Sequence, residues 1–135
     1  MLKKNIESLS VKLLEELFPS ELMEYFIISS YYPLCDVEKR KEILIIEFEE
    51  KNELPNGYST SDYESKGFIG SSLIQDFPLR GKPVYLSVKK RRWRHKITGH
   101  IIKRDFTFIA DGSKFTRELS DFLKDGNQYA RRYHQ

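Results

Sequence analysis

The chain has 135 residues and a formal net charge of +3, and with 39% hydrophobic and 13% aromatic residues its composition is typical of one folded domain rather than a disordered segment. Its single cysteine, Cys35, excludes an intramolecular disulfide and a four-cysteine zinc site, and we interpret it as a half-buried thiol. The longest aliphatic run, residues 43–46, is far shorter than the ~20 residues of a membrane span. The N-terminal residues do not form a signal-peptide pattern. We therefore expect a soluble, cytoplasmic protein without a membrane partner.

The charge is unevenly distributed along the chain. Residues 1–64 contain 7 Lys and Arg against 14 Asp and Glu, a balance of −7, whereas residues 65–135 contain 16 against 6, a balance of +10. The window from Arg80 to Arg104 contains ten Lys or Arg and no acid. Such segregation indicates a polyanionic partner, but it is also compatible with acidic and basic parts that face each other in the fold.

The N-terminal part predicts two helices. Leucines recur at helical spacing from about Lys3 to Phe18, and Pro19 ends this helix. We interpret Ser20 as the N-cap of a second, short helix over residues 21–26. Such a helix pair most often provides packing. A homodimer contact remains the alternative, because symmetric homodimers are common.

The middle of the chain predicts two strands and a long loop. Residues 42–50 are rich in β-branched side chains, and residues 26–32 are the expected antiparallel partner, connected through residues 33–41. Residues 51–67 contain Pro, Asn-Gly and several serines, so they read as a loop. We expect this loop to act as a hinge between the acidic and basic parts.

The basic part predicts a hairpin and a closing helix. A Pro-Leu-Arg-Gly turn at residues 78–81 precedes a strand, and a second turn at Thr98-Gly99 leads to a return strand over residues 100–110. The helix that follows has Ser113 as its expected N-cap and Gly126 as its expected stop.

These elements predict an α+β fold with N-terminal helices, an antiparallel sheet, a basic β-hairpin and a C-terminal helix. We expect residues 1–60 to form an acidic helix-and-strand part, residues 61–126 to form the basic hairpin and closing helix, and residues 127–135 to be a flexible tail. The first two parts are expected to share one compact domain.

The basic hairpin is the candidate nucleic-acid contact, because a two-stranded ribbon fits the major groove and cations meet phosphates. Trp93 would either stack on a base or brace the hairpin. The competing interpretation is a solvated strand face whose cations prevent edge aggregation, and a structural corner in the case of Arg80 and Lys82. The predicted DNA-contacting residues are Arg80, Lys82, Lys89, Lys90, Arg91, Arg92, Trp93, Arg94, Lys96, Lys103 and Arg104.

The residue patterns do not predict an enzyme. His95, His100 and His134 lack metal-ligand spacing, and the acids near the basic hairpin are not clustered as in a metal-assisted nuclease. No glycine-rich phosphate loop or nucleophile motif is present. We therefore expect a non-catalytic protein without a metal or cofactor.

Six sequence pieces between Glu64 and Lys124 resemble a known family: "ESKGF", "QDFPLRGKPVYL", "RRWR", "TG", "KRDF" and "KFTRELSDFLK". Together they resemble the N-terminal region of the ISAon-type insertion-sequence transposases. The order of pieces is also similar to the start of the ISL-three-type transposases, in which paired cysteines form a zinc ribbon. Here "HKITGH" occupies the ribbon positions without cysteine, so the hairpin resembles a ribbon that has lost its metal.

The resemblance implies a role in the transposition of a mobile element. The chain would contact transposon-end DNA during DNA recombination, while a separate catalytic transposase subunit carries the chemistry. The alternative function is a protein-interaction module that docks this subunit through its acidic residues. These would be Glu47, Glu49, Glu50 and Glu53. RNA binding is a third possibility, although no aromatic RNA-binding motif is present.

Overall fold

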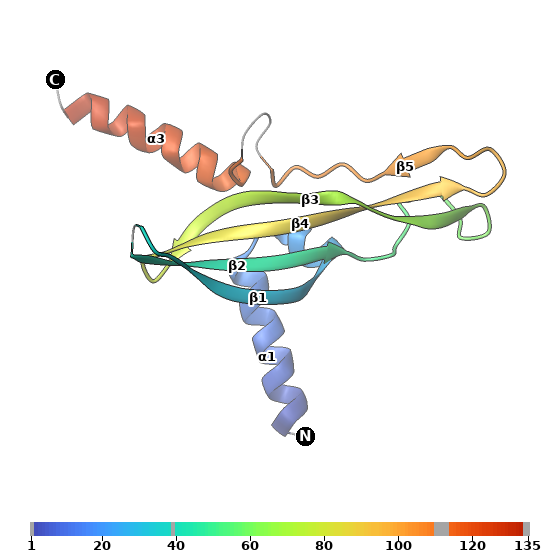
Figure 1. Cartoon of the computed structure of the whole chain (residues 1–135), viewed down its shortest axis with the longest axis horizontal. Coiled ribbons are helices and arrows are strands. Elements are labelled where there is room, and N and C mark those ends of the chain that lie inside the picture. Colours follow the sequence, from blue (N-terminus) through green and yellow to red (C-terminus); the bar gives the residue numbers. More distant parts are fainter. Residues whose placement is uncertain (1, 39, 110–113, 134–135) are drawn as a thin grey trace.

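The computed structural model describes residues 2–38, 40–109 and 114–133. It confirms the predicted α+β class and places the strands in one mixed sheet (Figure 1). The elements in chain order are α1 (Leu2–Leu17), α2 (Ser20–Tyr25), β1 (Phe26–Asp36), β2 (Lys41–Glu50), β3 (Tyr63–Leu79), β4 (Lys82–His95), β5 (Ile101–Lys103) and α3 (Arg117–Tyr133).

The strand order is β1-β2-β4-β3, and β5 pairs with β4. The β1–β2 and β3–β4 pairs are antiparallel, as predicted for residues 26–32 and 42–50, but β2 and β4 run parallel. The prediction of a wholly antiparallel sheet is therefore wrong at its centre. β4 takes the central position because Val84, Leu86 and Val88 are all at most 1% exposed, whereas most β3 side chains are exposed and suit an edge.

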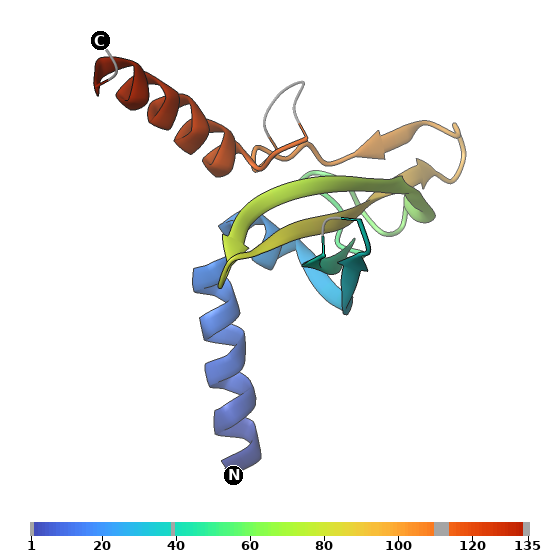
Figure 2. The same cartoon turned by 60° about the vertical axis from the view of Figure 1, so that its left-hand side comes forward.

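The hydrophobic core lies on one face of this sheet. The three apolar side chains of β4 pack with Phe48 of β2, and Leu22 of α2 and Phe108 cover them. Phe18 closes the core where α1 meets the sheet, and its ring lies 5.6 Å from that of Phe48, edge to face. The rest of α1 extends away from the sheet (Figures 1 and 2).

The helix ends differ from the predicted ones. Pro19, not Ser20, is the N-cap of α2, and its carbonyl oxygen accepts the N–H of Leu22. Ser113, the predicted N-cap of α3, lies outside the described residues. Thr116 caps α3, because its hydroxyl oxygen accepts the N–H of Leu119 at 3.3 Å. The prediction that the helix stops at Gly126 is also wrong, since α3 continues to Tyr133.

β3 begins inside the predicted loop, because residues 63–65 pair with β4. Its register shifts three times, between Ser65 and Phe68, between Phe68 and Ser71, and between Asp76 and Leu79. One glycine lies in each of the first two irregularities, Gly67 with φ +83° and Gly70 with φ +94°, a backbone conformation that other residues rarely adopt. Such bulges increase the twist of the long β3–β4 hairpin.

The remaining expectations are met in part. Arg80 and Gly81, with φ of 51° and 77°, form the tight turn predicted before β4, and this turn joins β4 to β3, a strand that was not predicted. The return strand is wrong in length, because only residues 101–103 pair with β4. The chain then leaves the sheet and is held to α2, where the carboxylate of Glu21 accepts the N–H of Thr107. Cys35 is exposed rather than half-buried.

Candidate nucleic-acid interface

The second half of β4 changes partner along one of its edges. β2 pairs with β4 as far as Glu49 and Lys89, and no further. β5 takes its place from Arg92 to Arg94. Arg91 lies between these two partners, so its backbone N–H needs another acceptor.

Glu50 supplies that acceptor. Its Oε1 accepts the backbone N–H of Arg91 at 2.9 Å, and its own carbonyl oxygen accepts Nε of Arg91 at 3.2 Å. Glu50 is only 2% exposed, and burial raises its pKa above the ordinary value. The assignment of Glu50 to an exposed acidic docking surface is therefore wrong.

Arg104 closes the other side of this junction. Its Nη2 donates to the carbonyl oxygen of Glu53 at 3.0 Å, its Nε lies 3.7 Å from Oε2 of Glu50, and its guanidinium lies 4.2 Å from the ring centre of Tyr25. The Arg91 guanidinium donates to Oγ of Ser65 at 2.7 Å. Both arginines, which were predicted to contact DNA, thus hold strands and loop together.

Three further predicted DNA contacts form ion pairs with the acidic part of the chain. These pairs are Lys82–Glu42 at 3.3 Å, Lys89–Glu49 at 3.8 Å and Arg94–Glu64 at 3.4 Å. All six side chains are roughly one third to one half exposed, so each pair adds at most about 1 kcal/mol of stability. For these residues the acidic and basic parts face each other, which is the alternative that composition left open.

The loop over residues 51–62 covers the hairpin rather than acting as a free hinge. Trp93 is 1% exposed, and its Nε1 donates to Oδ1 of Asn52 at 2.9 Å. Nζ of Lys96 donates to the carbonyl oxygen of Thr60 at 3.1 Å. Because the Trp93 ring is buried, it cannot stack on a base in this structure, and it braces the hairpin instead.

In the described part of the hairpin, three predicted cations form neither an ion pair nor a side-chain hydrogen bond: Lys90, Arg92 and Lys103. Lys90 and Arg92 alternate with Trp93 along β4 and therefore project from the opposite side of the strand. Lys103 is directly opposite Arg92 in the β4–β5 register, so their side chains share that side. The structure thus brings these three charges together. Arg80 is exposed at the far turn, at the other end of β4.

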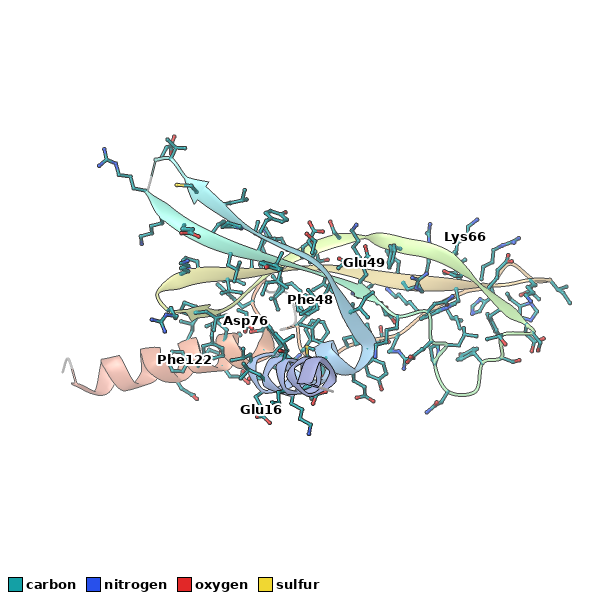
Figure 3. All side chains as sticks on the ribbon, turned by 90° about the horizontal axis from the view of Figure 1, so that it is seen from below. Glu16, Phe48, Glu49, Lys66, Asp76 and Phe122 are labelled. Atoms are coloured by element: carbon teal, nitrogen blue, oxygen red, sulfur yellow. The ribbon has the colours of Figure 1, made fainter. Side chains whose placement is uncertain are left out.

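Lys66 is an exposed cation that the sequence analysis missed. It lies on β3 between Ser65 and Gly67, within the stretch predicted to be loop (Figure 3). The spacing of Gly67 and Gly70 could have indicated that this stretch is a bulged strand, because glycines inside a strand often mark bulges.

The histidines have structural contacts. Nδ1 of His95 accepts the N–H groups of Ile97 and Thr98, and its ring packs edge to face on Tyr63. His95 and His100 are linked through their backbones at 2.8 Å, and His134 lies outside the described residues. Within residues 2–38, 40–109 and 114–133, no three His, Cys, Asp or Glu side chains gather as metal ligands would.

Comparison with known proteins returned no matching family model, curated protein or solved structure. Among the described helices, none has the length and apolar character needed to cross a membrane.

Proposed function

We propose that this chain is a non-catalytic DNA-binding module that contacts duplex DNA through Lys90, Arg92 and Lys103. The observation that supports the proposal most directly is that these three cations share one side of the β4–β5 ladder without an ion pair among the described residues. Trp93 and its loop brace the ladder from the other side.

The spacing of these charges suits phosphates. Lys90 and Arg92 are two residues apart on a strand, which separates them by about 7 Å, and neighbouring strands lie about 5 Å apart. Three cations on such a rigid ribbon can each meet a backbone phosphate. Partial burial limits the freedom of Arg92, so little side-chain entropy is lost on binding.

The transposon-end role is the finer part of the proposal, and the sequence resemblance supports it. In that role the chain would position DNA, and a separate catalytic transposase subunit would cut and join it. Several of the other predicted cations already form ion pairs or hold the junction at Glu50. We therefore expect their side chains to contribute less to DNA binding.

The test is the salt dependence of binding to a labelled duplex, measured by fluorescence anisotropy. Neutralising three phosphates predicts that log affinity falls with log salt with a slope of about −2.7, whereas contact by eight cations would give about −7. The double variant Lys90→Gln/Lys103→Gln should reduce the slope to about −0.9 and weaken binding at low salt.

The matched control is Lys41→Gln/Lys124→Gln, which removes the same charge from two exposed positions outside the hairpin. This control should keep the wild-type slope. Equal losses of DNA affinity in the two double variants would indicate only a net-charge effect. That result would overturn the assignment of the DNA contact to the hairpin cations. A wild-type chain that does not bind duplex DNA, or that binds single-stranded RNA more tightly at equal salt, would overturn the function.

A further inference from the structure

An isolated apolar side chain lies at the tip of the basic hairpin. Ile97 is in the turn between β4 and β5, and its side chain is 89% exposed, more than any other large hydrophobic side chain in the described part of the chain. The turn is at the outer end of the sheet, away from α1 and α3 (Figures 1 and 2). Single exposed apolar residues are common, so the exposure of Ile97 indicates a role only together with its surroundings.

The turn holds Ile97 in a fixed position. Nδ1 of His95 accepts the backbone N–H groups of Ile97 and Thr98, both at 3.1 Å. The carbonyl oxygen of His95 accepts the N–H of Gly99 at 3.0 Å, and the positive φ of Gly99, 76°, suits this tight turn. The His95 ring packs edge to face on Tyr63, with 5.0 Å between the ring centres. A turn ordered in this way loses little conformational entropy when its tip enters a binding site.

Cations follow the hairpin up to this tip. Lys96 directly precedes Ile97, and the window from Arg80 to Arg104, which contains the turn, has no acidic residue. Arg92 lies five residues from Ile97, which is at most about 17 Å along a strand and about half of the roughly 34 Å of one DNA turn. The tip can therefore enter a groove while cations at the base of the hairpin meet the phosphates beside it.

The turn between β1 and β2 offers a contrast. Its apolar residue Val37 is 84% exposed, nearly as much as Ile97, but it lies directly between Asp36 and Glu38. Carboxylates next to an apolar side chain are repelled by the phosphates that border a DNA groove. Of these two exposed apolar side chains, only Ile97 has surroundings that suit contact with DNA.

We infer that Ile97 inserts as a wedge between two stacked base pairs from the minor groove and thereby kinks the bound duplex. The inference rests on the proposed DNA contact and adds a bending activity to it. Insertion transfers the exposed Ile97 side chain from water to the apolar faces of the bases. Apolar wedges of this kind, isoleucine among them, unstack a base step from the minor groove and kink the duplex by about 20–90°.

Fluorescence energy transfer across a duplex labelled at both ends tests the inference with the full chain. A duplex of about 20 base pairs is about 68 Å long, and a central kink of about 60° would shorten its end-to-end distance to about 59 Å. Saturating wild-type protein should therefore raise the transfer efficiency. Ile97→Ser should leave the efficiency at the value of free DNA, whereas Ile97→Leu keeps an apolar wedge and should retain the increase.

Anisotropy measurements on the same duplex separate bending from binding. Ile97→Ser should keep the salt dependence of the wild type, because the phosphate contacts are unchanged. Its affinity should change less than about tenfold, since the contacts that a wedge gains are offset by the cost of unstacking. Val37→Ser is the matched control, because it removes an equally exposed apolar side chain from the other turn, and it should bend DNA like the wild type. Circular dichroism checks that each variant folds.

The outcomes distinguish the wedge from the DNA contact itself. Salt-dependent binding by the wild type without increased energy transfer would overturn the wedge and leave the proposed DNA contact in place, as expected if Ile97 only touches a thymine methyl group in the major groove. Wild-type bending by Ile97→Ser, or an equal loss of bending in Val37→Ser, would also overturn the wedge. A wild-type chain that binds no duplex would overturn the proposed function, and the wedge with it.

Discussion

Arg91 and Glu50 bind each other twice, each through its backbone and its side chain. The N–H of Arg91 donates to the Glu50 carboxylate at 2.9 Å, and the Arg91 guanidinium donates to the Glu50 carbonyl oxygen at 3.2 Å. This exchange lies where β2 leaves β4 and before β5 replaces it. The carboxylate therefore takes the place of a strand carbonyl at a gap in the ladder of backbone hydrogen bonds. Arg91 is thus used to stabilise the fold.

Glu50→Ala should lower the free energy of unfolding by about 2–4 kcal/mol. The change removes the acceptor of a buried N–H and leaves Arg104 beside an empty position. Urea denaturation followed by circular dichroism measures the loss. The control is Glu53→Ala, whose exposed carboxylate can be removed while its carbonyl oxygen still accepts Arg104, so the change should stay within about 0.5 kcal/mol. Equal losses of unfolding free energy in Glu50→Ala and Glu53→Ala would contradict the role of the Glu50 side chain at this junction.

The raised pKa of Glu50 predicts a specific pH dependence of stability. Burial raises this pKa above 4.5, so the folded state holds the proton more tightly than the unfolded state. The stability that Glu50 contributes is therefore fully present below pH 4.5 and is lost as pH rises through the raised pKa. The difference in unfolding free energy between wild type and Glu50→Gln should fall across that window. Urea curves at several pH values measure it, and a difference that rises with pH would contradict the direction.

Trp93 offers a direct optical test of its bracing role, because it is the single tryptophan of the chain. Buried at 1% exposure, it should show weak quenching by iodide in the folded protein and strong quenching in urea. Saturating duplex DNA should leave its emission nearly unchanged, since the ring does not stack on a base. Strong quenching by DNA would show that the ring becomes accessible on binding.

Thr116 links the start of α3 to β3. Its hydroxyl donates to Oδ1 of Asp76 at 3.0 Å and accepts the N–H of Leu119, and it is fully buried. Thr116→Ala should cost about 2–4 kcal/mol, because it removes a helix cap and leaves the buried Asp76 without that partner. Thr116→Ser keeps the hydroxyl and should retain most of the unfolding free energy that Thr116→Ala loses, as measured in a thermal or urea melt. Lys124→Ala on the exposed side of α3 should leave the free energy of unfolding nearly unchanged.

Local periodicity was sufficient to predict much of the architecture. The leucine spacing of α1, the β-branched run of β2 and the Arg80-Gly81 turn each depend on neighbours in the sequence, and each lies close to its predicted position. The class of fold and a basic hairpin therefore followed from the sequence alone, because side-chain spacing and turn preferences act over a few residues.

The free charges could not be identified in that way. Lys89 and Lys90 are consecutive and chemically identical, yet the parallel register places Glu49 opposite Lys89, while Lys90 projects to the other side of the strand. Likewise, Glu50 is buried because Arg91 and Arg104, 41 and 54 residues away, close over it.

The sequence by itself determined where positive charge accumulates and, apart from their exact ends, which segments form α1, α2, β1, β2, β4 and α3, but it did not predict the long strand β3. The tertiary structure alone decided which strands are neighbours, and hence that Arg91 and Arg104 stabilise the fold while Lys90, Arg92 and Lys103 form no ion pair within the part of the chain that the structure describes. The physical reason is that strand pairing is a contact between distant residues. Periodicity reports which face of a strand is apolar, but it carries no information about the strand that lies beside it.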